Sequence, residues 1–180
     1  MKMVGIEEHV LPGEIRQAWT TLPGADDGTL MLNAPAIAER LADLGEKRLA
    51  LMDETGIDMQ VLLLTTPGLN NLGEHGVDLA RRVNDRLAEV VQRHPSRFRA
   101  LASLPFASAD AAARELSRAV TELGALGAIL YGRVGNKHLD DEMFEATFAC
   151  AAELNVPLLT STDSTDGGTP ALLRGLFADY

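Results

Sequence analysis

The chain has 180 residues, of which 46% are apolar and 23% are charged, and its formal net charge is −10. This length and balance are typical of one globular domain with a sizeable core. The negative charge argues against a nucleic-acid partner, because nucleic acid is held mainly by Lys and Arg side chains that neutralise phosphates.

The single cysteine and the hydropathy of the chain argue against a disulfide-linked, membrane-spanning or secreted protein. Cys150 is the single cysteine, so no disulfide can form within the chain, and its helical setting predicts a small buried residue rather than a catalytic thiolate. No stretch approaches the ~18 apolar residues that span a bilayer, and the chain reaches Glu7 and Glu8 without a signal-peptide pattern. We therefore expect a cytoplasmic protein with no membrane partner.

The first predicted strand, residues 3–6, leads directly into Glu7, Glu8 and His9. Side chains alternate along a strand, so Glu7 and His9 point to one side and Glu8 to the other. A carboxylate oxygen and an imidazole nitrogen that converge at a strand end are suitable as two ligands of a divalent metal ion. Taken alone, however, this pattern is explained better by a solvated surface pair.

Helical segments and short apolar runs alternate along the rest of the chain. Apolar runs at 59–64, 98–104, 125–130 and 156–159 predict four more strands. Helical periodicity predicts helices over 36–55 with Gly56 as C-cap, over 77–94, over 109–123 between the caps Ser108 and Gly124, and from Asp140 or Asp141 through Leu154. Such alternation makes a parallel sheet with helices packed outside it.

Two α/β architectures compete for this pattern. A (β/α)8 barrel typically needs ~250 residues and at least about 200, and with five predicted strands this chain would hold a little over half of one. A doubly wound sheet fits the length, but residues 7–13 after the first strand are not a dinucleotide fingerprint. Both architectures place chemistry at the carboxyl end of the first strand.

Several short motifs, in order, resemble the amidohydrolase-related decarboxylases, a group that includes γ-resorcylate, 2,3-dihydroxybenzoate and aminocarboxymuconate semialdehyde decarboxylases. The matching stretches are 5–9 (GIEEH), 48–57 (RLALMDETGI), 82–85 (RVND), 94–98 (HPSRF), 102–105 (ASLP), 115–116 (EL), 122–124 (ELG), 127–128 (GA), 138–141 (HLDD) and 154–158 (LNVPL). The resemblance covers roughly residues 1–159 and defines residues 1–180 as a single incomplete domain with a divergent tail at 160–180.

The resemblance implies a partial (β/α)8 barrel of about the first five β/α units, with one Zn2+ or Mn2+ at its mouth. Glu7 and His9 are then the two first-strand ligands. The implied activity is nonoxidative decarboxylation of a hydroxylated aromatic or related unsaturated carboxylic acid. The metal holds the carboxylate and an adjacent hydroxyl of this small-molecule substrate, and an aspartate protonates the ring carbon as CO2 leaves.

The chain departs from the family pattern after its fifth predicted strand. Ser161 stands where the resemblance places the third ligand, a histidine, and Asp163 lies two residues too late. The family's later histidine and its catalytic aspartate are absent before Tyr180, so no catalytic acid is identified. We therefore expect a truncated or internally deleted member, with doubtful metal occupancy and impaired activity.

Other polar residues carry weaker predictions. Arg133 follows the fourth predicted strand and is a candidate to bind a substrate carboxylate, because guanidinium pairs with carboxylates bidentately. His75 and His94 are expected at helix ends, His138 in an exposed loop, and Trp19 in the loop after the first strand.

Two alternatives stay open. A noncatalytic half-barrel would expose strand edges and apolar interior side chains, which favours a homo-oligomer. A hydrolase of the wider amidohydrolase superfamily would use similar first-strand ligands to activate water.

Overall fold

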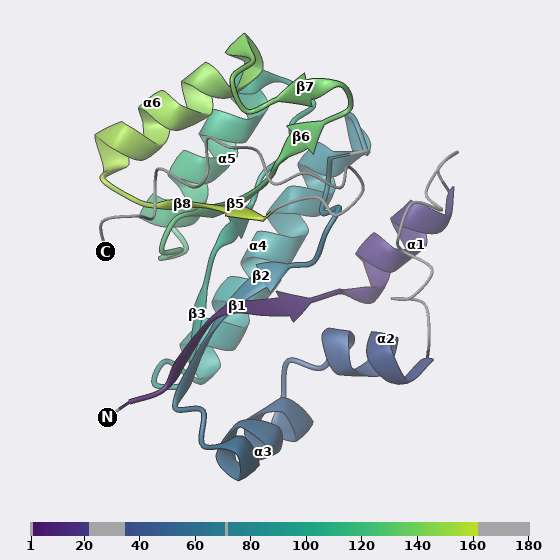
Figure 1. Ribbon diagram of the computed structural model, residues 1–180, viewed down its shortest axis with the longest axis vertical. Coiled ribbons are helices and arrows are strands. Elements are labelled where there is room, and N and C mark those ends of the chain that lie inside the picture. Colours follow the sequence, from purple (N-terminus) through teal and green to yellow (C-terminus); the bar gives the residue numbers. More distant parts are fainter. Residues whose placement is uncertain (1, 22–34, 71, 162–180) are drawn as a thin grey trace.

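The computed structural model describes residues 2–21, 35–70 and 72–161, and its centre is a parallel sheet (Figure 1). Its strands pair in the order β1-β2-β3 and β4-β5-β8. They are β1 (Val4–Val10), β2 (Met59–Leu64), β3 (Phe98–Ala100), β4 (Ala102–Ser103), β5 (Ala128–Tyr131) and β8 (Leu158–Ser161).

Leu101 joins the two parts of this sheet. Its N–H donates to the carbonyl of Leu62 in β2, and the N–H of Ala102 donates to the carbonyl of Gly127, which precedes β5; both distances are 2.9 Å. β3 and β4 are therefore the two halves of one strand, which pairs first with β2 and then with β5. The predicted strand over 98–104 is confirmed in this divided form.

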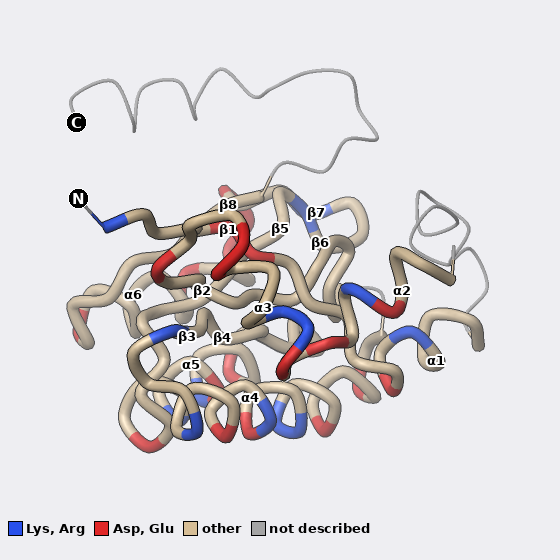
Figure 2. Tube along the Cα trace, turned by 90° about the horizontal axis from the view of Figure 1, so that it is seen from below, with Lys and Arg blue, Asp and Glu red and all other residues tan. Residues whose placement is uncertain are grey.

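The helices between the strands form an outer layer. They are α1 (Gly13–Thr21), α2 (Pro35–Ala42), α3 (Glu46–Thr55), α4 (His75–Arg93), α5 (Ala109–Thr121), the short η2 (Glu142–Phe144) and α6 (Glu145–Leu154). A two-stranded hairpin, β6 (Arg133–Val134) and β7 (Lys137–His138), follows β5. Figure 2 shows α4 and α5 as a layer beneath the strands, with acidic and basic residues along their outer side.

Alternate strand residues face two different apolar clusters, and this decides between the two predicted architectures. Leu62 and Leu64 of β2 pack toward α4, and Leu130 of β5 packs in the cluster that contains α5 and α6. The residues between them, Val61, Leu63, Leu101, Ile129 and Tyr131, form a separate cluster on the other face. A doubly wound sheet carries helices on both faces, whereas here α4, α5 and α6 pack on one, as in a (β/α)8 barrel. The chain is an α/β protein with a partial barrel.

The predicted helix over 36–55 is wrong as a single element. The structure divides it into α2 and α3, because Gly45 has φ −131° and ψ −137°, outside the helical region, and its N–H bonds the side chain of Asp43 at 3.0 Å. Gly56 ends α3 with φ 75°, as predicted for a C-cap.

The segment after β1 also differs from the prediction. Trp19 was expected in a loop but lies in α1, where Ile15 and Trp19 are buried one turn apart. Gly124 has the expected positive φ of 74°, but α5 ends earlier, with Glu122 as its C-cap. Within the described ranges, no helix combines the length and the apolar character needed to cross a bilayer.

Candidate metal-binding site

Glu7 and His9 lie inside β1, which continues to Val10 rather than ending before them. The pairing of β1 with β2 shifts between Gly5 and Glu8, which marks a β-bulge. After the bulge Glu8 pairs with Leu62, which packs toward the helices in what we call the outer cluster. His9 pairs with Leu63, which lies on the opposite face in the inner cluster of Val61, Leu63, Leu101, Ile129 and Tyr131. His9 therefore belongs to the inner face of the sheet and Glu8 to the outer face.

The side chains of Glu7 and His9 converge as their spacing predicts. The Glu7 Oε1 to His9 Nε2 distance is 3.6 Å, and the two side chains are 50% and 33% exposed. Two ligand atoms on one Zn2+ or Mn2+ lie about 3 to 3.5 Å apart at usual bond lengths of about 2.1 Å. The separation lies just above this range, and the oxygen and nitrogen donors are of the types that occupy two positions of a divalent-metal site.

A third ligand is not found in the part of the chain that the structure describes. No group of three or more His, Cys, Asp and Glu side chains that could hold a metal occurs in residues 2–21, 35–70 and 72–161. Ser161 lies at the carboxyl end of β8, where it pairs with Tyr131. Asp163 and the rest of residues 162–180, in the tail predicted to be divergent, fall outside the described residues.

Arg48 of α3 contacts β1 at its outer edge. Its Nη2 donates to the carbonyl oxygen of His9 at 2.9 Å, its Nη1 to Gln60 Oε1 at 3.2 Å and its Nε to the carbonyl of Asp43 at 2.8 Å. Burial lowers the pKa of Arg48, and the negative charges of Glu8 and Asp43 oppose that shift. The backbone of His9 is thus held from the helix layer.

The loops at the carboxyl ends of the strands are tied to one another. Trp19 Nε1 donates to the carbonyl of Gly68 at 2.9 Å, and the buried hydroxyl of Tyr131 donates to the carbonyl of Leu64. A Cβ on Gly68, whose φ is +63°, would lie 2.2 Å from the Tyr131 ring, so this close approach requires glycine. Burial raises the pKa of Tyr131, which keeps its hydroxyl protonated as a donor.

Arg133 lies in β6, at the same end of the sheet as His9. Its carbonyl accepts a hydrogen bond from Asn70 Nδ2 at 2.6 Å, so the loop after β2 holds the hairpin that follows β5. Its role in carboxylate binding stays a prediction.

The other predicted residues occupy structural positions. His75 is the exposed first residue of α4, His94 is the C-cap of that helix, and His138 is exposed in β7. Cys150 Sγ lies 3.5 Å from the carbonyl oxygen of Ala113, and burial raises the pKa of its thiol. A raised pKa favours the neutral thiol of Cys150 over the thiolate.

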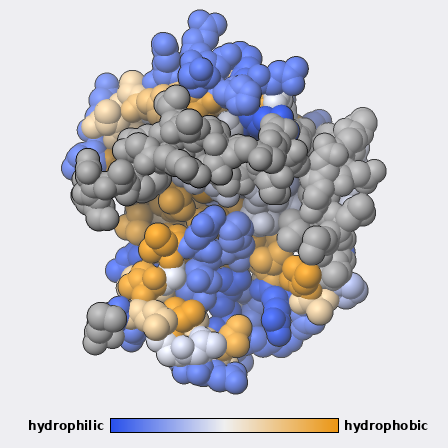
Figure 3. Space-filling view, in the orientation of Figure 1, coloured by the Kyte–Doolittle hydropathy of each residue, from blue (hydrophilic) through white to orange (hydrophobic). Residues whose placement is uncertain are grey.

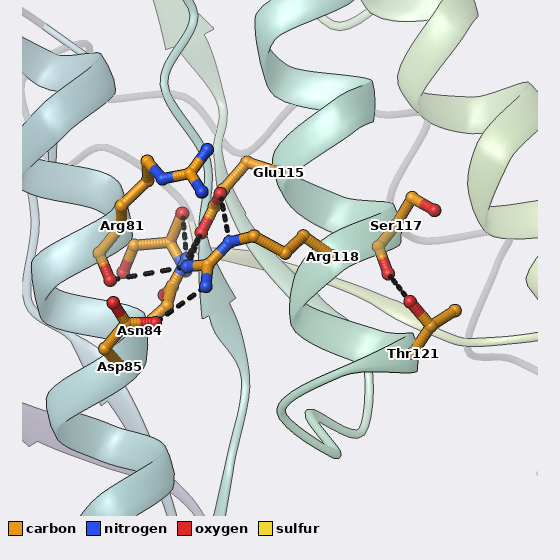
Figure 4. A network of polar contacts seen from close by, with 8 residues as sticks. Arg81, Asn84, Asp85, Glu115, Ser117, Arg118 and Thr121 are labelled. Atoms are coloured by element: carbon orange, nitrogen blue, oxygen red, sulfur yellow. Dashed lines mark hydrogen bonds and ion pairs between the residues drawn. The ribbon is translucent and has the colours of Figure 1, made fainter.

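The motif residues Asn84 and Glu115 lie in a polar network between α4, α5 and β4 (Figure 4). Asn84 exchanges two hydrogen bonds with the backbone of Ser103, at 3.0 and 2.8 Å, and donates to Glu115 at 2.7 Å. Arg118 donates to both carboxylate oxygens of Glu115 and, at 2.7 Å, to Asp85. These residues join the helices to the strand, a role that the motif match did not distinguish from site chemistry.

A groove of about 790 Å³ runs beside β1, between this strand and helices α2 and α3. Its lining includes Glu7, Glu8 and His9 from β1 and Lys47 and Arg48 from α3. In the lower half of the view in Figure 3, over β1 and α3, a hydrophilic strip has hydrophobic surface on both sides.

Comparisons with known proteins identify a family. Residues 9–180 match the amidohydrolase family. A γ-resorcylate decarboxylase from Rhodococcus jostii is 39% identical over 132 residues, which are 72% of this chain and 38% of that protein. The chain thus spans well under half the length of this curated relative.

Solved structures of decarboxylases share the fold. The 5-carboxyvanillate decarboxylase from Novosphingobium aromaticivorans, with bound manganese and 3-methoxy-4-hydroxy-5-nitrobenzoic acid, matches with a TM-score of 0.82 and 32% identity. The match covers 97% of this chain and 55% of that one. A dihydroxybenzoic acid decarboxylase from Polaromonas sp., with bound manganese and 2-nitroresorcinol, matches with a TM-score of 0.76 and 30% identity, over 97% of this chain and 52% of that one.

Proposed function

The chain belongs to the amidohydrolase family, and on that premise we propose that it provides the metal-binding strand of a nonoxidative decarboxylase of hydroxylated aromatic carboxylic acids. The observation that carries the proposal is the 3.6 Å approach of Glu7 and His9 on the inner face of β1. Active sites of (β/α)8 barrels lie at the carboxyl ends of their strands. The similar proteins support this assignment: they are decarboxylases, and the two solved structures contain bound manganese.

Glu7 and His9 are proposed to hold a divalent ion through Oε1 and Nε2. We favour Mn2+ over Zn2+, because manganese occupies the similar solved structures and a carboxylate is among its preferred ligands. An ion held by these two residues would supply Lewis-acid chemistry toward a substrate carboxylate.

The surrounding residues bind and orient the substrate. The inner cluster that contains Val61 and Leu63 provides a dry apolar wall beside His9, which strengthens charge interactions at the site. Arg133 is proposed to hold a carboxylate, with its backbone fixed by Asn70. Because the described residues offer two ligands and no third, we expect the 180-residue chain by itself to bind the ion weakly and to turn over slowly.

Titration of Mn2+ into the chain, followed by electron paramagnetic resonance, tests the site. Glu7→Gln and His9→Asn are expected to abolish the bound signal, because each removes one of two ligands. Glu8→Gln is the matched control, since Glu8 lies on the same strand but on the outer face. Equal losses in all three variants would contradict a site on the inner face.

An activity assay separates the reaction classes. We expect slow CO2 release from 2,6-dihydroxybenzoate that depends on added Mn2+ and on Glu7. Hydrolysis of esters or amides without CO2 release would instead favour the hydrolase alternative, and CO2 release at the same rate in Glu7→Gln would refute the assigned ligand.

A second candidate function is self-association through β1, which the exposure of its apolar residues favours. Met3, Val4 and Ile6 are 58%, 45% and 64% exposed, and no described strand pairs with the far edge of β1. An apolar open edge is a template for pairing with another chain. Sedimentation should show a dimer or larger species that Ile6→Lys dissociates, and a monomeric wild-type chain would contradict this candidate.

A further inference from the structure

We propose that Arg48 is the positioning residue of the metal-binding end of β1: its guanidinium fixes the register that turns Glu7 and His9 to the inner face. The inference rests on the proposed function for the identity of the ligands. It assigns to Arg48 a role in orienting them, without any contact between Arg48 and the ion or the substrate.

Arg48 lies at the edge of β1 that no described strand pairs with. In a strand of a parallel sheet, residues two apart direct their N–H and C=O groups to the same neighbour. The carbonyl of His9 accepts from Arg48 at 2.9 Å, and the N–H of Leu11 donates to the carbonyl of Leu41 in α2 at 2.8 Å. Two consecutive edge positions at this end of β1 are therefore held by the helix layer instead of by a strand.

The register of β1 against β2 determines which face Glu7 and His9 occupy. The bulge between Gly5 and Glu8 shows that β1 already pairs irregularly with β2, and a further slip of one residue would turn Glu7 and His9 outward. Arg48 opposes such a slip, because it binds the backbone of β1 at His9 and the side chain of Gln60 on β2.

The contacts at position 48 require an arginine and not a lysine. The planar guanidinium presents donors in a fork, whereas a lysine ammonium is a single point of charge on a flexible stem. Nε, Nη1 and Nη2 of Arg48 reach three acceptors within 3.2 Å, on Asp43, Gln60 and His9, and Nη2 also donates to the carbonyl of Arg40 at 3.4 Å. A lysine at this position would keep the attraction to Glu8 but could not hold all three acceptors at once.

Arg97 offers a matched control at the other end of the same strands. Its Nε and Nη2 donate to the carbonyls of Asp58 and Ile57, which precede β2, and its Nη1 pairs with Asp53 at 2.7 Å. Arg97 thus makes a similar set of contacts far from the carboxyl end of β1.

The experiment compares Arg48→Lys and Arg48→Met with Arg97→Lys, using amide hydrogen exchange at Leu11 and Mn2+ binding as two readouts. We expect Leu11 exchange to rise roughly tenfold in Arg48→Lys, as for the loss of a charge-assisted hydrogen bond. Mn2+ affinity should fall in parallel, and Arg48→Met should show both effects at least as strongly. Arg97→Lys should leave both readouts at the wild-type value even where it lowers the melting temperature equally.

Unchanged Leu11 exchange in Arg48→Lys, or an equal rise in Arg97→Lys, would overturn the positioning role. Absence of Mn2+ binding by the wild-type chain would refute the proposed function instead, and Leu11 exchange would still decide the role of Arg48. The conservative Arg48→Lys variant keeps the charge and the aliphatic stem, so it preserves the fold in which exchange is measured.

Discussion

Glu7 and Glu115 are both motif glutamates, but their side chains differ in solvent exposure and in hydrogen-bond partners. The Glu115 side chain is 5% exposed, and it accepts hydrogen bonds from Asn84 and Arg118. The Glu7 side chain is 50% exposed, and His9 approaches it at 3.6 Å. A buried carboxylate with its partners in place stabilises the fold, whereas the exposed Glu7 and His9 side chains keep the donor atoms that we propose as metal ligands accessible.

The largest effect that tests this contrast is expected at Arg118. Arg118→Met would leave the Glu115 carboxylate buried without its cation, and we expect the free energy of unfolding to fall by about 3 kcal/mol. Urea denaturation measures the change. Arg114→Met on the same helix is the control, because its pair with Asp110 is exposed, and a change within about 0.5 kcal/mol is expected. Equal losses in the two variants would show that the network is not the source of stability.

Asn84→Ala is expected to follow, with a loss of about 2 kcal/mol in the free energy of unfolding, because the backbone N–H and C=O of Ser103 lose their partner side chain. Thermal unfolding measures the effect. Asn136→Ala, at an exposed position in the turn of the β6–β7 hairpin, should be close to neutral. A neutral Asn84→Ala would remove the structural role of the network.

The same substitution at Glu7 and at Glu115 tests most directly whether one glutamate belongs to the site and the other stabilises the fold. Glu7→Gln should change the free energy of unfolding by less than about 0.5 kcal/mol, because the side chain is half exposed. Glu115→Gln should destabilise the chain, since Arg118 loses the more buried of its two counter-charges, Glu115 and Asp85. If Glu7→Gln were the more damaging of the two in denaturation, the division between fold and site would be wrong.

The smallest expected effect is a pH dependence at Asp141. Hydrogen bonds from the Met143 N–H and from Lys137 lower the pKa of Asp141. A lowered pKa favours the carboxylate in the folded chain, so this stabilisation is present above the ordinary aspartate pKa and is lost as the pH falls through the lower folded value. The Met143 amide signal, followed by NMR, should titrate below the ordinary aspartate range and should lose this step in Asp141→Asn.

The elements that sequence analysis predicted well are those formed by local interactions. The apolar stripe predicted over 77–94 corresponds to α4, whose inner face is buried. Ser108 caps α5 as predicted, because its hydroxyl accepts the N–H of Ala111 at 3.1 Å from only three residues away. The break at Gly45 was missed because helical periodicity continues across it, and α1 was missed because its burial depends on Trp19 reaching Gly68, which is 49 residues away in sequence.

In the candidate site, too, the local features were predicted from the sequence and the features that depend on long-range contacts were not. That Glu7 and His9 share one side of β1 follows from the two-residue period of a strand, and it was correctly read from the sequence. Which side they share was decided by pairing with β2, since the register after the bulge places His9 opposite Leu63, on the inner face of the sheet. Arg48 contributes to that register from 39 residues away, a contact that no local pattern reveals. The sequence alone determined the donor atoms of the two proposed ligands and their spacing, and tertiary structure decided the face, because register depends on long-range hydrogen bonds.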